Sequence, residues 1–519
     1  MINNKVVFCY LIFAVIIFAA LALNNFPNYY AYLKNPDNSF YSGQASWFDP
    51  WDLNVYASAV KWGQSGKILL ENLYTTEAPQ KAILYYPTYT FLGFFFPQTP
   101  PFILFHCAAF LLGGALIIAL FQMIKVFIRQ KMLSLLALFL IVFGGGLGWL
   151  FFPKTASADL FITGFTFVSH FQRPHEAIGI FLYLYLLVSY FYDSEKERKF
   201  SFLPLLACML LVVYYPYYLL SYFLICGLYG LLLWLKKNKT NFLVYLLINA
   251  LVCSPIALFY YSHLHLNATF SGVWRQKLET PGLLMLVLGY GILLIPFVYQ
   301  LFYPVRKKGT LFLNLWVIGS FVLAFFPFGF ARFYLRGLFF PLVIIAIYSL
   351  DEISSKLKIN KKYFIALLII CLPISTFFIT YKRIAEIKTG SRWFYLTAEE
   401  GKGFDFLNNN TEKNSGVLTA YTIANYLPVH TDNRVYFGHF LQTPEAEEKI
   451  QLLYAFYGNL FSESEAKEFI ASNNIDYVWW GLEEKEITGK TEEKTLKYSF
   501  LKPVYENEDV VIYVFNFGD

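Results

Sequence analysis

Two carboxylates in a short polar segment are the side chains of this chain best suited to proton transfer. Asp49 and Asp52 lie three residues apart within residues 47–56, and the surrounding sequence is strongly apolar. A carboxylate held at a membrane surface is costly to place, which favours a functional interpretation, and it can accept a proton from a hydroxyl group. The alternative is structural, because Asp is a favoured N-cap. If residues 53–66 are helical, Asp52 and Tyr56 share one face.

A second group of polar side chains stands just before and at the start of an apolar run at residues 177–192. Its members are His170, Arg173, His175 and Glu176. The two histidines are five residues apart, which is wrong for one helical face and disfavours zinc binding of the HxxxH kind. Cations here could contact a phosphate group or an acceptor molecule. Glu176 also has a structural interpretation, because an acidic residue in the first turn of a helix complements the helix dipole.

Arg332 and Arg336 form a third candidate group. On a helix their spacing of four residues would put them on one face, at the depth where a lipid phosphate lies. Both could instead be membrane anchors that bind headgroups or snorkel to the interface. We interpret His263 and His265 as residues of a solvent-exposed loop, and Gly438-His439 as residues that end a strand.

Apolar runs long enough to cross a bilayer must position these groups. Hydrophobic residues make up 57% of the sequence and charged residues only 15%. We therefore expect a polytopic helical membrane protein with about eleven transmembrane helices. The predicted spans are residues 5–23, 101–124, 133–152, 177–192, 201–214, 217–235, 241–261, 283–303, 310–327, 337–350 and 362–380. The six cysteines all lie in apolar runs without a CxxC pair, so we expect neither a disulfide framework nor a metal knuckle.

Short basic loops indicate the orientation of the spans. Lys and Arg gather near residues 125–131, 196–199, 236–239, 306–308 and 358–362, which the positive-inside rule assigns to the cytoplasm. The same rule explains the net charge of +6, so no nucleic-acid partner is expected. The apolar run at 83–97 is short and contains Pro87, and counting it as a span would place the later basic loops outside. We interpret it as an interfacial or re-entrant helix. The outer loops are then 24–82, 153–176, 262–282 and 328–336, and they hold the candidate residues.

The composition changes after residue 389. We expect a transmembrane domain at 1–389, with a long first outer loop at 24–82, followed by an extracytoplasmic α/β domain at 390–519. Strands are predicted at residues 416–420, 475–480 and 510–515, and helices at 444–457 and 462–473. The second of these helices begins with Ser462 and Glu465, which are spaced as a capping box.

The first outer loop carries a pattern that resembles a known family. The pattern is Asp52-x-x-Val55-Tyr56-x-x-Ala59, Gly66, Leu73-Tyr74 and Tyr86-Pro87. It is similar to the first outer loop of membrane glycosyltransferases of the GT-C superfamily, above all the bacterial mannosyltransferases that use polyprenyl-phosphate sugars. The resemblance implies a GT-C-like fold, a polyprenyl-phosphate sugar donor, and an acidic loop residue that acts as base or positions the acceptor hydroxyl. Asp52 is the matching residue. Asp49 is the candidate for a second acidic contact, although Pro50 departs from a plain Asp-Glu pair.

The resemblance also suggests roles for the other polar residues. The donor phosphate would be bound by Arg332, Arg336, Arg173 and His170. Contacts to the acceptor, or auxiliary contacts, would come from Tyr56, His175 and Glu176. Metal dependence varies within the superfamily, so no cofactor is certain. A divalent cation could be bound by Asp49, Asp52, Glu176 and a histidine.

We therefore expect a glycosyltransferase integral to the plasma membrane, which transfers a hexosyl or pentosyl group with inversion. The acceptor would be a glycan, lipid or protein on the extracytoplasmic side of the cell envelope. One alternative is a lipid or polysaccharide transporter or flippase, which would need ionisable residues near the bilayer midplane, where the predicted spans have almost none. Another is a non-catalytic membrane scaffold with a partner-binding outer domain, which would leave the first loop unexplained.

Overall fold

The structure is a computed structural model that describes residues 4–198, 201–274, 277–305, 307–327, 329–358, 360–488 and 496–515. Lys199 and Arg306, from two of the predicted basic loops, lie outside the described residues. The chain divides into two units. Unit 1 comprises Met1–Phe26, His106–Tyr260 and Lys277–Lys382, and unit 2 comprises Pro27–Phe105, Tyr261–Gln276 and Arg383–Asp519. Unit 2 thus combines the first loop with the C-terminal part of the chain, and the expected domain boundary at residue 389 stays a prediction.

Nine helices within the described ranges are long and apolar enough to cross a membrane. In lipid every backbone N–H and C=O must be satisfied within the chain, and apolar runs of this length achieve this as helices. They are α1 (Asn4–Leu33), α4 (Pro101–Phe127), α5 (Lys131–Phe143) with α6 (Gly148–Phe151), α9 (Pro174–Lys196), α11 (Tyr217–Lys237), α12 (Asn241–His265), α14 (Leu283–Tyr290) with η2 (Gly291–Leu293) and α15 (Leu294–Phe302), η3 (Ala331–Leu335) with α17 (Phe339–Leu357), and α18 (Lys361–Cys371) with α19 (Ile374–Lys388). The shorter apolar helices α10 (Phe202–Tyr214) and α16 (Thr310–Ala324) coincide with the other two predicted spans. The expected polytopic helical membrane protein is confirmed.

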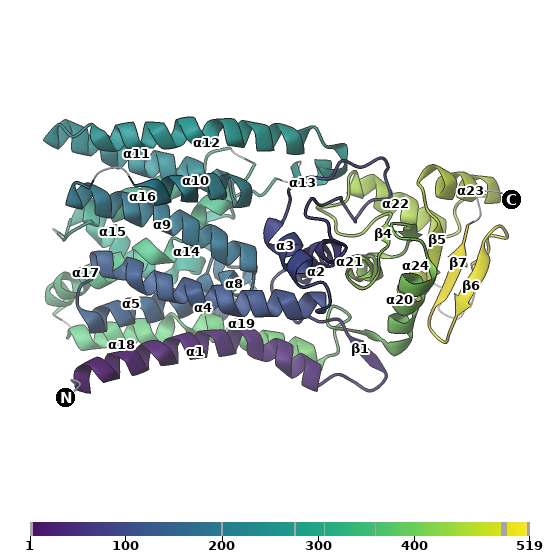
Figure 1. The fold of residues 1–519 in the computed structure, drawn as a ribbon. Helices are drawn as coiled ribbons and strands as arrows, with labels where there is room; N and C mark the ends of the chain where they lie inside the picture. The colour runs from purple at the N-terminus through teal and green to yellow at the C-terminus, as the bar shows by residue number, and fades with distance from the viewer. Residues whose placement is uncertain are drawn as a thin grey trace. The chain divides into compact units, whose positions relative to one another are not determined.

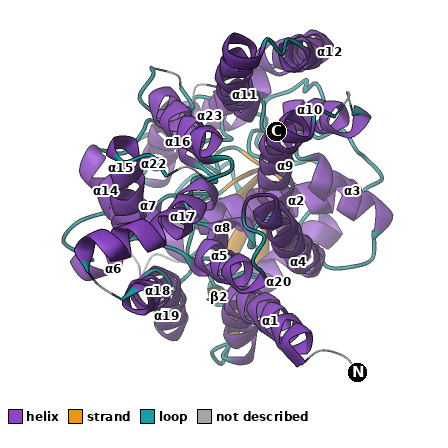
Figure 2. Ribbon diagram, turned by 90° about the vertical axis from the view of Figure 1, so that its left-hand side faces the viewer, coloured by secondary structure: helices purple, strands orange, loops and turns teal. Residues whose placement is uncertain are grey.

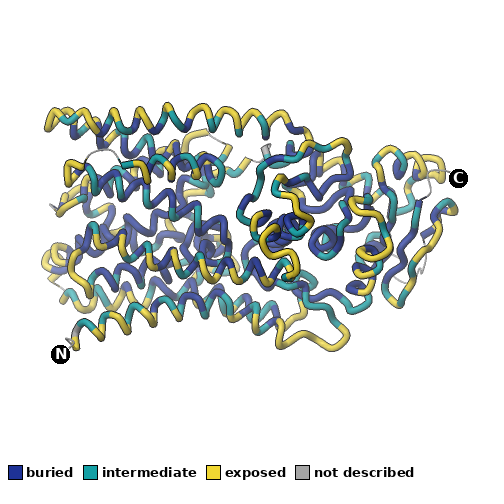
Figure 3. Tube along the Cα trace, in the orientation of Figure 1, coloured by how far each residue is buried: buried dark blue, intermediate teal, exposed yellow. Residues whose placement is uncertain are grey.

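Helix α17 forms the centre of unit 1. In Ala331–Leu357, 100% of the most apolar 18-residue stretch is buried, whereas in α12 only 22% of the corresponding stretch is buried. Helix α17 packs against α5, α15, α16 and α18, which surround it in Figure 2. Figure 3 shows α12 exposed along much of its length, and its exposed residues include Leu251, Leu258 and Phe259. An apolar surface of this kind is typical of a helix that faces lipid.

A mixed five-stranded sheet forms the core of the C-terminal part of unit 2. Its strand order is β4 (Arg434–Val435), β3 (Gly416–Leu418), β5 (Tyr477–Trp480), β7 (Val511–Val514) and β6 (Lys502–Glu506). Strand β3 is parallel to β4 and β5, and β7 is antiparallel to β5 and β6. Trp479 and Trp480 are both fully buried, in two different apolar clusters. Because successive side chains of a strand point to opposite faces, the sheet is covered on both sides.

Helices complete this α/β arrangement. They are α20 (Ala398–Asn410), α21 (Tyr421–His430), α22 (Ala446–Tyr457), α23 (Glu463–Ser472) and α24 (Leu482–Ile487). The predicted strands correspond to β3, β5 and β7, and the predicted helices to α22 and α23. The capping box is present, because the Ser462 side chain accepts a hydrogen bond from the Glu465 N–H and the Glu465 carboxylate accepts one from the Ser462 N–H.

The first loop folds as part of unit 2. Helix α2 (Pro50–Gln64) lies beside α3 (Pro87–Phe95) and α21 (Figure 1), and strand β1 (Ser39–Tyr41) pairs antiparallel with β2 (Tyr395–Thr397). A Cβ on Gly63 would lie 2.1 Å from the carbonyl oxygen of Thr90, so a glycine is needed where α2 meets α3. Helix α3 has nine residues and is about 14 Å long, too short for a hydrocarbon core of about 30 Å. The predicted interfacial or re-entrant character of 83–97 agrees with this length.

The sidedness of the membrane protein is a testable prediction. In a background without the six native cysteines, an impermeant maleimide added to intact cells should label Glu468→Cys and should not label Lys237→Cys. Both side chains are exposed, and the basic loop at 236–239 is expected in the cytoplasm. Both variants should be labelled after permeabilisation, which controls for reactivity. Labelling of Lys237→Cys in intact cells would contradict the orientation.

Candidate functional site

Asp52 lies in the first turn of α2 and contacts a histidine from the C-terminal part of unit 2. The Nε2 atom of His439 is 2.8 Å from Oδ1 of Asp52. The His439 side chain is 2% exposed and that of Asp52 is 22% exposed. Asp52 is therefore held on one side by a buried partner and remains accessible from solvent.

Neither Asp49 nor Asp52 caps α2 through a side-chain hydrogen bond. Asp52 is the third residue of α2, and Asp49 occupies the N-cap position with φ 42° and without a side-chain capping hydrogen bond. The N-cap interpretation is therefore wrong for Asp52, whereas Asp49 has the N-cap position without a capping hydrogen bond to its side chain. The helix starts at Pro50 because proline suits the first helical position.

Tyrosines surround Asp52. The pKa of each is raised, mainly by removal from water, and the negative charge of Asp52 contributes; for Tyr421 the pKa is raised to about 12. The others are Tyr74, Tyr85 and Tyr86. These phenols stay protonated at neutral pH and can donate hydrogen bonds, but they do not act as bases. Tyr56 stacks on Tyr89 with ring centroids 5.0 Å apart and is almost completely buried, so its predicted contact with an acceptor stays a prediction.

In unit 1, three of the predicted residues surround the carboxylate of a fourth, Glu176. Oε1 of Glu176, in the first turn of α9, lies 3.6 Å from Nη1 of Arg336 and 3.7 Å from Nη1 of Arg173. Its Oε2 atom lies 3.3 Å from Nδ1 of His170. All four side chains are buried. Burial lowers the pKa of His170 despite the neighbouring carboxylate, so the positive charge is carried by the arginines.

Arg336 contacts both the backbone and an aromatic ring. Its Nη2 atom donates to the carbonyl oxygen of Thr163 at 3.1 Å, and its guanidinium lies 4.2 Å from the ring centroid of Phe333. Gly164 has φ +79°, and a Cβ there would lie 2.3 Å from Nε of Arg336, so only glycine fits. Within the described residues, Nη1 of Arg336 is buried without a hydrogen-bond partner. This donor could serve an anionic ligand.

The predicted helical face shared by Arg332 and Arg336 does not exist. Residues Ala331–Leu335 form a 3-10 helix, and Arg336 follows it with extended backbone angles. With three residues per turn, a spacing of four does not align two side chains. The guanidinium of Arg332 lies 5.9 Å from the ring centroid of Phe333. His175 stacks on Tyr215 at 5.9 Å between ring centroids.

The residues present do not fit the divalent-cation site that the sequence left possible. Among the described residues, no group of three or more His, Cys, Asp or Glu side chains could hold a metal ion. The oxygens of Glu176 face three basic side chains. Nδ1 of His439 accepts a hydrogen bond from the N–H of Leu441 at 3.2 Å, which leaves the imidazole proton on Nε2. A protonated Nε2 cannot bind a metal beside Asp52.

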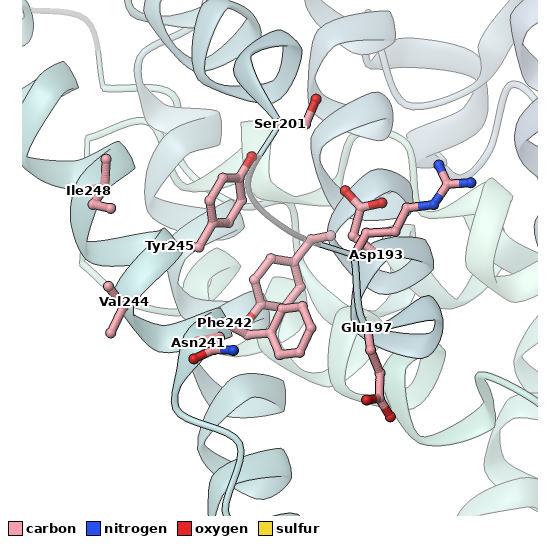
Figure 4. A pocket seen from close by; sticks show the side chains of 10 residues that line it. Asp193, Glu197, Ser201, Asn241, Phe242, Val244, Tyr245 and Ile248 are labelled. Atoms are coloured by element: carbon pink, nitrogen blue, oxygen red, sulfur yellow. The ribbon is translucent and has the colours of Figure 1, made fainter.

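Cavities lie near titratable groups in both units. One of about 310 Å³ in unit 1 is lined by residues of α9, of α12 and of the segment after α9, including Asp193, Glu197 and Tyr245 (Figure 4), and its lining contains none of the predicted site residues. Another, of about 280 Å³ in unit 2, is lined by Tyr421, Glu483 and aromatic residues. The second cavity shares Tyr421 with the surroundings of Asp52.

Comparisons with known proteins identify the fold. No protein-family model and no curated protein sequence matches the chain. A solved structure of the archaeal oligosaccharyltransferase AglB from Archaeoglobus fulgidus, in complex with an inhibitory peptide and a dolichol-phosphate, is similar with a TM-score of 0.55 and 12% identity over 93% of this chain and 70% of that chain. The chain has the GT-C fold.

Two further structures support this assignment. The oligosaccharyltransferase of Archaeoglobus fulgidus in complex with Zn and sulfate has a TM-score of 0.53 and 13% identity, over 91% of this chain and 68% of that chain. ArnT from Cupriavidus metallidurans bound to undecaprenyl phosphate has a TM-score of 0.50 and 11% identity, over 100% of this chain and 99% of that chain. The expected GT-C-like fold is confirmed, and at these identities the likeness concerns the fold alone.

His439 is the residue that sequence reasoning missed. It lies 387 residues from Asp52, in a turn that has an ordinary structural explanation. The local signal was a histidine beside a glycine after a predicted strand, which does not specify a partner. The contact becomes visible only when the first loop and the C-terminal part fold together as unit 2.

The buried cluster around Glu176 yields a stability prediction. Glu176→Gln keeps the side-chain volume but removes the carboxylate that Arg173 and Arg336 face, and breaking a buried ion pair from one side costs about 3–5 kcal/mol. Thermal unfolding in detergent should show a large loss of stability. Glu197→Gln, which removes the exposed partner of Lys239, is the matched control and should change little. Equal stability of both variants would contradict the electrostatic role of Glu176.

Proposed function

We propose that this protein is an integral membrane glycosyltransferase that transfers a sugar from a polyprenyl-phosphate donor to an acceptor at the outer face of the plasma membrane. The observation that carries the proposal is Asp52, a partly exposed carboxylate held by a buried histidine in a chain with the GT-C fold. The solved structures of AglB with a dolichol-phosphate and of ArnT with undecaprenyl phosphate support a lipid phosphate as the donor class. A hexosyl or a pentosyl group would be transferred.

The chemistry is a single displacement at the anomeric carbon. The oxygen of an acceptor hydroxyl attacks this carbon from the side opposite the phosphate. The bond between the carbon and the phosphate oxygen breaks, and the polyprenyl phosphate leaves with the bonding electrons. Asp52 accepts the hydroxyl proton as the new glycosidic bond forms. Attack opposite the leaving group inverts the configuration of the anomeric carbon.

We assign the donor phosphate to the arginines of unit 1. Arg336 has a buried N–H of Nη1 without a hydrogen-bond partner in the part of the chain that the structure describes. A phosphate oxygen would satisfy this donor, and guanidinium–phosphate hydrogen bonds are strong because both partners are charged. Arg173 adds a second positive charge at Glu176, and Arg332 and His170 are the further candidates.

The contacts of the auxiliary residues suggest different roles for them. Glu176 holds Arg336 and Arg173 in place and so supports the phosphate site. We place the acceptor, which could be a glycan, lipid or protein, near Asp52 in unit 2, where the cavity beside Tyr421 offers about 280 Å³. Tyr56 and His175 are proposed as supporting residues, since each stacks on a neighbouring tyrosine.

The proposal predicts that Asp52 is required for transfer. Asp52→Asn nearly keeps the volume but cannot accept the proton, and kcat should fall by about 10²–10⁴-fold, the usual scale for loss of a general base. Transfer from a synthetic polyprenyl-phosphate sugar to a lysate-derived acceptor fraction would measure it. Asp37→Asn, an exposed position in the same unit, is the control for the amide substitution. A folded Asp52→Asn protein with normal transfer would exclude Asp52 as the base and make Asp49 the next candidate.

The donor site yields a separate prediction. Arg336→Lys keeps the charge but loses the planar pair of donors, so binding of undecaprenyl phosphate should weaken by about tenfold or more. Arg332→Ala should raise the KM for the donor. Binding of the lipid phosphate to purified protein in nanodiscs checks both without an acceptor. Normal binding by both variants would exclude these arginines from the donor site.

A further inference from the structure

We propose that His439 is a positioning residue that holds Asp52 through Oδ1 and so fixes the orientation of the carboxylate that accepts the proton. The inference rests on the proposed function, because it concerns how the base is presented. It adds a residue to the site from a part of the chain that lies 387 positions away in sequence.

The hydrogen bonds of the imidazole determine where its proton lies. The backbone N–H of Leu441 donates to Nδ1 of His439 at 3.2 Å, so Nδ1 presents a lone pair. A neutral imidazole has one N–H, which must therefore be on Nε2. This N–H points at Oδ1 of Asp52 over 2.8 Å, and the histidine donates to the carboxylate.

This arrangement excludes His439 as the base or as a proton relay. Its Nε2 atom already carries a proton, and its Nδ1 lone pair is used by Leu441. The proton taken from the acceptor must remain on Asp52 until the product leaves. The histidine fixes the orientation of the carboxylate, and it supports the charged form because a hydrogen bond to an ion is stronger than one to a neutral group.

The turn that carries His439 is fastened to the first loop. The N–H of Gly438 donates to Oγ1 of Thr443, and this hydroxyl donates to the carbonyl oxygen of Tyr74. The side-chain amide of Asn72 donates to the carbonyl oxygen of Gln442 at 2.7 Å. A Cβ on Gly438 would lie 2.6 Å from the Tyr74 ring, so a larger residue would displace the turn. The imidazole is therefore held from both ends of residues 438–443.

Several other titratable side chains face Asp52 and bear on its pH dependence. They are Tyr74, Tyr85, Tyr86 and Tyr421. The pKa of each phenol is raised, mainly by removal from water, so none of them titrates in the acid range. These phenols therefore contribute no change of charge to the acid limb of a pH profile.

The test compares three substitutions in the full-length protein. His439→Gln can place an N–H near the position of Nε2, whereas His439→Asn is one methylene shorter and His439→Ala has no donor. We expect His439→Gln to keep kcat within about threefold. His439→Asn and His439→Ala should lose about 10–100-fold, the scale of a hydrogen bond to a charged group, with little change in the KM for the donor.

The pH profile separates positioning from a general loss of structure. Without the N–H donor the carboxylate is less stabilised, so the acid limb of kcat/KM should move to higher pH by up to about one unit in His439→Asn and His439→Ala, but not in His439→Gln. His430→Gln, at another buried histidine of unit 2, should leave the acid limb unchanged. Equal rates for the Gln and Asn variants, or loss of rate with an unchanged acid limb, would overturn the proposal.

Two further measurements distinguish this proposal from its premise and from a metal site. Normal transfer by Asp52→Asn defeats the proposed function, whereas an inactive Asp52→Asn with a fully active His439→Ala defeats only the role of His439. A metal acting through the pair would make the rate ratio of wild type to His439→Ala collapse in EDTA and return with added Zn²⁺. We expect the ratio to be unchanged by EDTA, and its collapse would overturn the assignment.

Discussion

The structure depends on one constraint: a carboxylate that leaves water must be paired. Three carboxylates meet it in different ways. Asp159 is fully buried and accepts hydrogen bonds from the hydroxyls of Ser157 and Ser375 and from the N–H of Gly146. Glu176 faces Arg173, Arg336 and His170. Asp52 is bound on one side by His439 and stays partly exposed. The first two environments enclose their carboxylates, and the third leaves one accessible for reaction.

The enclosed carboxylates also organise the backbone of unit 1. The hydroxyl of Ser375, near the start of α19, lies within hydrogen-bond distance of both Asp159 and the carbonyl oxygen of Gly146, so segments more than 200 residues apart meet at one buried acid. The glycines at 144–148 allow this approach, since a Cβ on Gly148 would lie 1.7 Å from the Ser157 hydroxyl oxygen. Gly164 does the same for Arg336. These glycines permit close packing around polar groups.

The sequence predicts what depends on composition and local periodicity. Apolar runs located the nine long helices and the two shorter ones, and the predicted strands correspond to β3, β5 and β7. It failed where the outcome depends on distant partners. The pairing of β1 with β2 joins the first loop to residues after the last span, and no local pattern encodes it. The spacing of Arg332 and Arg336 was misread because the segment forms a 3-10 helix. For His439, the fold supplied a partner that the turn itself did not specify.

The partners of the Asp52 and Glu176 carboxylates suggest why Asp52 would be the base. Protonating Glu176 would give up its interaction with two guanidinium groups, so it is a poor proton acceptor and a good anchor. Asp52 faces a neutral imidazole and four phenols that stay protonated. A neutral donor orients a carboxylate without adding the full positive charge that would oppose proton uptake. A base must be fixed in place and must keep enough basicity to accept a proton. A hydrogen bond from a neutral histidine fixes the carboxylate without removing its basicity.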